Sequence, residues 1–515
     1  MNKDVVMVGA GVANVNAATK LIDKGYKGKI TIIDMGKDPY LRPYEEVMTG
    51  FLGAGGWSDG KLTYHTSIGG QLSKYCGEEK AMELFDQVIN NFKRFHPKPE
   101  EVQCSNPTAE PDFIKPHFGL RLFPVWHVGT DYLHEIGKNW YDFLVEGGVE
   151  FYWESKVTDI NFKNNKLEIG KKMDGHFLYY DTLIFGVGKS GIDFGKKLAE
   201  QYDLPTEPKP VQIGVRFEAP QKHFQKLIDV SYDFKLYRKF EDKGVSLRSF
   251  CTNNNAAYVA VEQTYGDVSY NGHAKKGEEH RNNMTNFGIL MEIQGIEKPF
   301  DWSRKLVKEV NEFWMDCSRG IGRFARKAHS GLYYSPTRER GMTSEGILVD
   351  AMHIDSLNQV KDAFQGYYSY IEDFIEDMKK VFPTLKDDWG IYVPEVKYLS
   401  PEPLVNYEDL SLTKFPNVHF VGDALSARGI TVSGAQGTLV AEQILSIDDA
   451  INEFLSDPVN NKEPHEMGDM HEYIQGGLTM PKEDRKQYLK NEIHNKRSDG
   501  YMIKGMEEEL KKLEK

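Results

Sequence analysis

The chain has 515 residues, 40% of them hydrophobic and 27% charged, a composition typical of a globular protein with two or three domains. Its formal net charge of −13 lacks the basic excess with which nucleic-acid-binding proteins neutralise phosphates, so we expect neither nucleic acid nor a membrane surface as a partner. Four widely spaced cysteines argue against a disulfide framework. The sequence shows neither a leader pattern nor an apolar run long enough to span a membrane, so we expect a cytoplasmic protein.

The first 35 residues alternate between strand-like and helix-like patterns. Asp4–Ala10 is an apolar run of strand length, apolar residues recur at helical spacing from Gly11 to Leu21, and Lys29–Met35 is a second apolar run. A strand, a helix and a strand within about thirty residues form a βαβ unit, whose two strands pair in parallel.

The turn of this unit, GAGVAN, has the dinucleotide-binding pattern G-x-G-x-x-G with Asn14 in place of the third glycine. Gly9 permits a tight turn, and Gly11 lets the start of the helix approach a pyrophosphate, which its amides and dipole stabilise. Asp34 ends the second strand, where a carboxylate accepts hydrogen bonds from ribose hydroxyls. The turn therefore predicts a dinucleotide site.

A second motif lies near the other end of the chain. Asn417–Leu445 reads as a strand, an exposed Gly422–Asp423 step, a loop and a helix. In a flavoprotein of this topology Asp423 would hold the ribityl chain, and a helix beginning near Ser433–Gly434 would face the flavin and stabilise the negative charge that reduction brings.

Two other glycine clusters have competing interpretations. GVGKSG, residues 186–191, could begin a separate NAD(P) site, but no βαβ unit with a suitable acid follows, so we interpret it as a turn that contacts FAD through its backbone. GGWSDGKL, residues 55–62, matches a phosphate-binding P-loop except that Leu62 replaces the Ser or Thr that ligates magnesium. We interpret it as a loop whose backbone approaches FAD, with Trp57 or Ser58 near the flavin ring and Lys61 beside it.

The arrangement of these motifs predicts an α/β protein. A discontinuous Rossmann-like FAD-binding domain, with a parallel sheet and a β-meander, would hold an inserted α+β substrate domain and end in a charged helical tail. The predicted limits are 1–207 and 385–447 for the FAD-binding domain, 208–384 for the inserted domain and 448–515 for the tail.

The same segments carry a family resemblance. MTGFLGAGGWSDGKL, HVGTD, FGVGKSG, PVQIGVRFEAP, NGH, PEVKYLS and VGDALSARGITVSGAQG occur in matching order between about residues 3 and 447, and together they resemble the FAD-dependent dehydrogenases of a largely uncharacterised group related to the HI0933-like flavoproteins. More remotely they resemble FAD folds of the glutathione-reductase type. The resemblance implies FAD and leaves the substrate open. No flavin-attachment motif is evident, so we expect the FAD to be bound non-covalently.

These patterns select the candidate site residues. We expect the cofactor to contact Gly9, Gly11, Ala13, Asn14, Asp34, Met35, Gly55, Ser58, Asp59, Lys61, Val157, Gly186, Gly188, Gly422, Asp423, Gly434 and Ala435. The catalytic candidates are His65, His273, Lys397 and Arg428, with Arg216 and the Glu395/Lys397 couple on one strand face as further polar groups. No metal site is expected.

The expected activity is hydride transfer between FAD and a small anionic or unsaturated substrate, with a separate electron donor or acceptor. Two alternatives stay open. The chain could be an FAD-dependent oxidase or lyase acting on an amine or amino-acid-like group, including one on a modified nucleobase. It could also be a catalytically silent flavin-binding scaffold.

Overall fold

The computed structural model describes residues 3–43, 46–170, 176–240, 243–318, 323–325, 350–351, 361–386, 388–399 and 401–456. The charged tail predicted for residues 448–515 therefore lies outside the described residues from 457 onwards. Among the described helices, none combines the length and the apolar character that a bilayer-crossing segment needs.

The N-terminal βαβ unit forms the centre of a six-stranded sheet. Val5–Val8 pairs in parallel with Ile30–Ile33 and, on its other edge, with Thr182–Phe185, and all three strands are buried along their whole length. Continuous apolar runs of this kind are typical of parallel strands covered on both faces. In sheet order the strands are β23 (Ser411–Leu412), β24 (Phe415–Phe420), β11 (Thr182–Phe185), β1 (Val5–Val8), β2 (Ile30–Ile33) and β7 (Glu150–Tyr152), with only β23 antiparallel to its neighbour.

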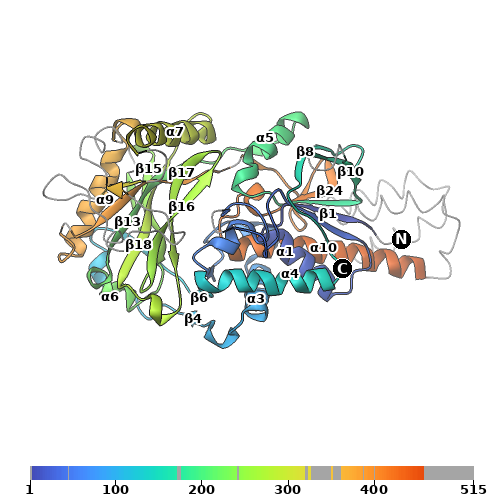
Figure 1. Cartoon of the computed structure of the whole chain (residues 1–515), viewed down its shortest axis with the longest axis horizontal. Helices are drawn as coiled ribbons and strands as arrows, with labels where there is room; N and C mark the ends of the chain where they lie inside the picture. The colour runs from blue at the N-terminus through green and yellow to red at the C-terminus, as the bar shows by residue number, and fades with distance from the viewer. Residues whose placement is uncertain are drawn as a thin grey trace, which may run out of the picture.

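Helices cover one side of this sheet and a small antiparallel sheet covers the other (Figure 1). Gly437 allows the closest helix contact, because a Cβ atom there would lie 1.8 Å from the carbonyl oxygen of Ala13. The helices are α1 (Val12–Asp23), α2 (Leu72–Cys76), α3 (Glu78–Phe95), α4 (Leu133–Glu146) and α10 (Ile430–Ser456), and the predicted meander consists of β8 (Lys156–Asn161), β9 (Lys166–Gly170) and β10 (His176–Tyr179). The predicted α/β class with a parallel sheet and a β-meander is thereby confirmed.

A second, eight-stranded sheet occupies the other half of the molecule (Figure 1). Its order is β20 (Asp350–Ala351), β19 (Arg323–Ala325), β21 (Gly390–Lys397), β13 (Val211–Pro220), β18 (Met284–Ile293), β15 (Val245–Asn253), β14 (Phe234–Phe240) and β5 (Gly119–Leu122). Along β13, Val211, Ile213 and Val215 belong to the apolar core of this half, whereas Gln212 lies on the opposite face. This alternation leaves one face of the sheet for polar side chains.

The apolar face is covered by α6 (Gln225–Ile228), α7 (Pro299–Ser318) and α9 (Tyr368–Val381). The hairpin of β16 (Ala257–Thr264) and β17 (Asp267–Ala274) lies across the polar face, where a Cβ atom at Gly272 would lie 1.6 Å from Nη2 of Arg216. The remaining elements lie outside the two large sheets: α5 (Ile192–Gln201), β3 (Lys61–Thr63), β4 (Cys104–Ser105), β6 (Val125–His127), β12 (Thr206–Glu207) and β22 (Glu402–Pro403).

Two strands of the second sheet come from outside the segment predicted to form it. β5 lies within predicted segment 1–207 and pairs with β14, while β21 lies within predicted segment 385–447 and pairs with β13. The apolar alternation of a strand identifies its buried face but does not identify its partner, so the pairing could not be read from these short segments.

Candidate functional site

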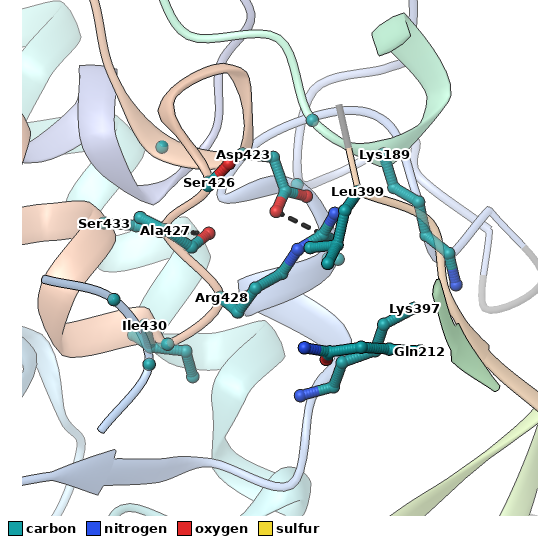
Figure 2. A pocket seen from close by; sticks show the side chains of 18 of the residues that line it. Lys189, Gln212, Lys397, Leu399, Asp423, Ser426, Ala427, Arg428, Ile430 and Ser433 are labelled. Carbon is teal, nitrogen blue, oxygen red and sulfur yellow. Dashed lines mark hydrogen bonds and ion pairs between the residues drawn. The ribbon is translucent and has the colours of Figure 1, made fainter. Parts of the chain in front are cut away.

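A cavity of about 1430 Å³ lies between the two sheets and has walls from both. The first half of the protein contributes the G-x-G turn, the end of β2, the glycine loop and the segment before α10. The second half contributes the polar face of β13, β14, β15 and β21. Figure 2 shows part of this cavity, where Arg428 lies between Asp423 and the neighbouring side chains of Gln212 and Lys397.

The two glycines of the turn have different roles. Gly9 has φ +94°, and a Cβ atom there would lie 2.7 Å from the carbonyl oxygen of Gly186, so the backbone fold requires glycine. Gly11 has an ordinary φ of −70°, and a Cβ atom there would meet only the same oxygen, at 3.7 Å. Because Gly11 lines the cavity at the start of α1, its missing side chain leaves space for a ligand instead of for the protein.

Asn14 stabilises the turn from behind and does not line the cavity. Its Nδ2 donates to the carbonyl oxygens of Val8, at 3.1 Å, and Gly9, at 2.7 Å. A Cβ atom at Gly186 would lie 2.7 Å from the same Nδ2, so the amide fills the space that a third glycine leaves open in the usual pattern. Asn14 thus changes the packing of the turn and leaves its cavity face intact.

Asp34 lines the cavity and holds three backbone amides around it. Its Oδ2 accepts from Ala10 N at 2.7 Å, and its Oδ1 accepts from Gly36 N at 2.7 Å and Gly50 N at 2.8 Å. A carboxylate oxygen has two acceptor sites, so Oδ2 retains one for a ligand hydroxyl.

The glycine loop packs directly on the G-x-G turn. A Cβ atom at Gly55 would lie 2.3 Å from Cγ2 of Val12, and Gly55 and Ser58 both line the cavity. Trp57, one of the two residues predicted to lie near the flavin ring, is not in the cavity wall. It packs 5.3 Å from the ring of His134 and from the guanidinium of Arg42.

Arg42 is a positioning residue that the sequence did not reveal. It is buried, and its guanidinium donates to the carbonyl oxygens of Phe51 at 2.7 Å, Val47 at 2.8 Å and Gly53 at 3.0 Å. These bonds fix the glycine loop from the side away from the cavity. An isolated arginine in a loop forms no periodic pattern, which is why sequence reasoning missed it.

Lys61 borders the cavity, but its ammonium is engaged within the protein. Nζ lies 3.1 Å from Asp59 and 2.8 Å from Asp233, and it donates to the carbonyl oxygen of Thr252 at 2.5 Å. Burial alone would lower the pKa of Lys61, but the two carboxylates raise it, so the lysine stays charged. Asp59 also accepts from Sγ of Cys251 at 2.8 Å, so this buried network joins the glycine loop to β14 and β15.

The segment before α10 presents an arginine with free donors. Nη1 of Arg428 lies 3.1 Å from Oδ1 of Asp423, whereas Nε and Nη2 have no partner among the described residues. Helix α10 begins at Ile430, one turn before the predicted start, and Gly434 lies inside it, packed against α1 and α3. A Cβ atom at Gly434 would lie 2.8 Å from Nδ2 of Asn16 and 2.9 Å from Val88.

The catalytic candidates fall into two groups. Lys397 and Arg428 line the cavity, whereas His65 and His273 do not. His65 accepts a hydrogen bond from Ser67 N at 3.1 Å, and His273 is buried in β17 beside the ring of Tyr258. Thr63, Ser67 and Gly272 do line the cavity, so each histidine lies close to the cavity wall without being part of it.

Glu395 and Lys397 share one face of β21, as their spacing predicted, and both line the cavity. Burial raises the pKa of Glu395 to about 7, although Arg216, 3.2 Å away, opposes this effect. The pKa of Lys397 is well below its usual value because of burial and because of nearby cations, first among them Arg248. Arg216 itself lies fully buried beneath the cavity floor.

Most of the predicted residues meet in this one cavity. Those that line it are Gly9, Gly11, Ala13, Asp34, Met35, Gly55, Ser58, Asp59, Lys61, Val157, Gly186, Gly188, Lys397, Gly422, Asp423 and Arg428. Those that do not are Asn14, His65, His273, Gly434 and Ala435. Sequence reasoning missed the cavity residues Lys189, Gln212, Lys235, Arg248 and Glu262. Strand alternation could have placed Gln212, Lys235, Arg248 and Glu262 on the polar faces of their strands, but it could not have shown that these faces meet in one cavity.

Comparisons with known proteins give distant likenesses only. No protein-family model matches the chain. An uncharacterized protein from Clostridium beijerinckii is 23% identical over 476 residues, which cover 85% of this chain and 80% of that protein.

Among solved structures, a mutant of the halogenase PltM in complex with FAD is 12% identical with a TM-score of 0.38, over 98% of this chain and 79% of the other. A glycine oxidase from Bacillus cereus is 12% identical with a TM-score of 0.37, over 86% and 95%. A flavoprotein/dehydrogenase from Cytophaga hutchinsonii is 13% identical with a TM-score of 0.34, over 86% and 79%. TM-scores this low carry no conclusion about chemistry, which has to follow from the residues of the cavity.

Proposed function

We propose that this chain is an FAD-dependent oxidoreductase that binds FAD non-covalently and transfers a hydride between FAD and a small anionic or unsaturated substrate. The observation that carries the proposal is the continuity of the cavity. It runs from a dinucleotide-binding turn and its acidic partner Asp34 to a polar sheet face with Glu395 and Lys397, which Arg428 faces from the loop before α10.

The residues of the first half fit FAD. The open space at Gly11 and the amides at the start of α1 suit a pyrophosphate, and the remaining acceptor site of Asp34 suits a ribose hydroxyl. Gly422, Asp423 and the amides at the start of α10 suit the flavin end of the cofactor. When bound, FAD supplies a two-electron carrier that accepts or donates a hydride.

The volume of the cavity exceeds that of an ordinary ligand site. Small-molecule pockets span roughly 300–1,000 Å³, and this cavity has about 1430 Å³. The excess is consistent with a site that holds a large cofactor and a separate substrate together.

The polar side chains of the second half, together with Arg428 in the segment before α10, then act on the substrate. Arg428 offers two free donors to an anionic group, and Glu395, whose pKa is raised to about 7, can hold or release a proton near neutral pH. The ion pairs of Lys61 with Asp59 and Asp233 fix the part of the cavity wall that joins the glycine loop to the second sheet. We further propose that the protein is a dehydrogenase of the HI0933-related group, that it is located in the cytoplasm, and that it exchanges electrons with a separate carrier.

Absorption spectroscopy of the purified full chain tests the proposal. We expect the visible bands of oxidised flavin, release of FAD on denaturation, and bleaching on anaerobic reduction. A colourless protein that cannot be reconstituted with FAD would contradict it. Stopped-flow reoxidation separates the forms of the activity, because rapid reaction with O₂ indicates an oxidase, and slow reaction indicates a dehydrogenase with another acceptor.

A further inference from the structure

Cationic side chains gather on the part of the cavity formed by the second sheet, although the chain as a whole has a net charge of −13. This cationic cluster consists of Arg121 on β5, Lys235 on β14, Arg248 on β15, Lys397 on β21 and Arg428 in the facing loop. It draws on four strands and a loop that are far apart in the sequence.

The strand register places like charges directly opposite each other. Lys235 pairs with Arg121, and two cations at directly opposite positions destabilise a sheet. Lys397 pairs with Gln212, and their side chains lie next to each other in Figure 2. Oε1 of Gln212 accepts from Arg248 at 2.9 Å, so Arg248 and Lys397 lie on either side of the same glutamine. An arrangement with this electrostatic cost is expected where a ligand supplies the opposite charge.

The acids near the cluster are already engaged. Glu292 lies 3.6 Å from Arg248, and Asp423 lies 3.1 Å from Arg428. Among the described residues, no carboxylate lies within ion-pair distance of Lys235 or Lys397. Burial lowers the pKa of Lys235 to about 8, against the attraction of Asp233, whose carboxylate is bound by Lys61. The cluster therefore holds more cations than paired carboxylates. Burial and the neighbouring cations, first among them Arg248, lower the pKa of Lys397, and a bound anion would favour its charged form.

Two members of the cluster also have a geometry suited to oxyanions. The free Nε and Nη2 of Arg428 lie along one edge of the guanidinium, which is the edge that binds a carboxylate or phosphate through two parallel hydrogen bonds. Nζ of Lys397 lies 3.4 Å from the centre of the Phe250 ring, a cation–π contact that holds the ammonium in place beside Gln212.

We infer that the substrate is a small organic polyanion with at least two oxyanion groups, one bound by the Arg428 edge and another by Lys397 and Lys235. The shared chemistry is that of a polycarboxylate or a phosphate ester. This inference rests on the proposed function, because it assigns the first half of the cavity to FAD and the cationic cluster to the substrate.

Calorimetric titration of the FAD-loaded full chain tests the inference with acetate, succinate, tricarballylate and glycerol 3-phosphate. We expect affinity to rise about tenfold or more from acetate to succinate, because a second charge-assisted contact is added. Tighter binding of tricarballylate than of glycerol 3-phosphate identifies a polycarboxylate substrate, and the reverse order identifies a phosphate ester. Equal affinity for acetate and the polyanions, or no binding of any of the four, overturns the inference.

Variants test the assignment to residues. Arg428→Lys keeps the charge and loses the two-donor edge, so we expect about a tenfold loss for succinate. Lys397→Met should weaken the same titration to a similar extent. Lys222→Met is the matched control, since its side chain is 72% exposed and lies outside the cavity. An equal loss in the control shows a general charge effect and overturns the assignment.

Flavin content separates the two proposals. A yellow protein that ignores all four anions overturns the polyanion inference and leaves the FAD proposal standing. A protein that binds succinate through Arg428 but never takes up FAD overturns the FAD proposal and leaves the polyanion site standing.

Discussion

Replacement of Gly11 by valine tests where a dinucleotide sits. The structure predicts a well-folded variant, because φ at Gly11 is −70° and a Cβ atom would meet only one protein atom within 4 Å, at 3.7 Å. The added side chain projects into the cavity at the start of α1 and displaces a pyrophosphate from the helix amides. Loss of two charge-assisted hydrogen bonds, at about 1.5–3 kcal/mol each, gives about 3–6 kcal/mol, or roughly a 10²- to 10⁴-fold weaker FAD affinity.

The measurement is FAD content after purification, followed by reconstitution and fluorescence titration with added FAD. Gly195→Ala is the matched control, because Gly195 lies in α5, outside the cavity, and a Cβ atom there would meet only Cε1 of Phe185 at 3.8 Å. Gly9→Ala should instead destabilise the fold, since φ is +94° and the new atom would lie 2.7 Å from a carbonyl oxygen. A Gly11→Val protein with wild-type FAD content and affinity refutes the placement of the pyrophosphate.

Three further outcomes follow from the site. Asn14→Ala removes two hydrogen bonds to the turn and should cost about 1–3 kcal/mol of unfolding free energy, measured by urea denaturation, and a variant as stable as wild type would contradict this role. Lys61→Met leaves Asp59 and Asp233 buried without their cation and should cost about 3–5 kcal/mol, and a melting temperature equal to wild type would contradict the network. Because the folded pKa of Glu395 is raised from 4.5 to about 7, its contribution to stability declines as pH rises through that window, so Glu395→Gln should gain stability relative to wild type between these pH values and level off above them. A pH-independent difference would show that Glu395 titrates normally.

The local motifs of the first half were predictable because each depends on a short stretch of sequence. The βαβ unit, the positive φ of Gly9, the acid at the end of β2 and the Gly422–Asp423 step are each features of one turn or one strand, although the contact of Gly9 with Gly186 is not. The start of α10 was predicted one turn too late, because Gly434 looked like a cofactor-facing residue and proved to be a helix-packing residue.

The chemistry of the second half depends on contacts between distant segments. The partners of Lys61 are 172 residues away in Asp233 and 191 residues away in Thr252. The cluster around Lys397 exists only because β5, β14, β15 and β21 lie in one sheet. Alternation along one strand shows which side chains share a face, but the facing partner is set by the sheet order, which the sequence of a single strand does not contain.

The membership of β5 and β21 in the second sheet has a consequence for motion. The chain passes between the two sheets four times, from β2 to β5, from β5 to β7, from β11 to β13 and from β21 to β23. A hinge that opened the cavity would have to change backbone angles in all four passages together and break the ion pair between Lys61 and Asp233. The two cavity walls therefore move as one rigid unit, and ligands exchange without any separation of the two sheets.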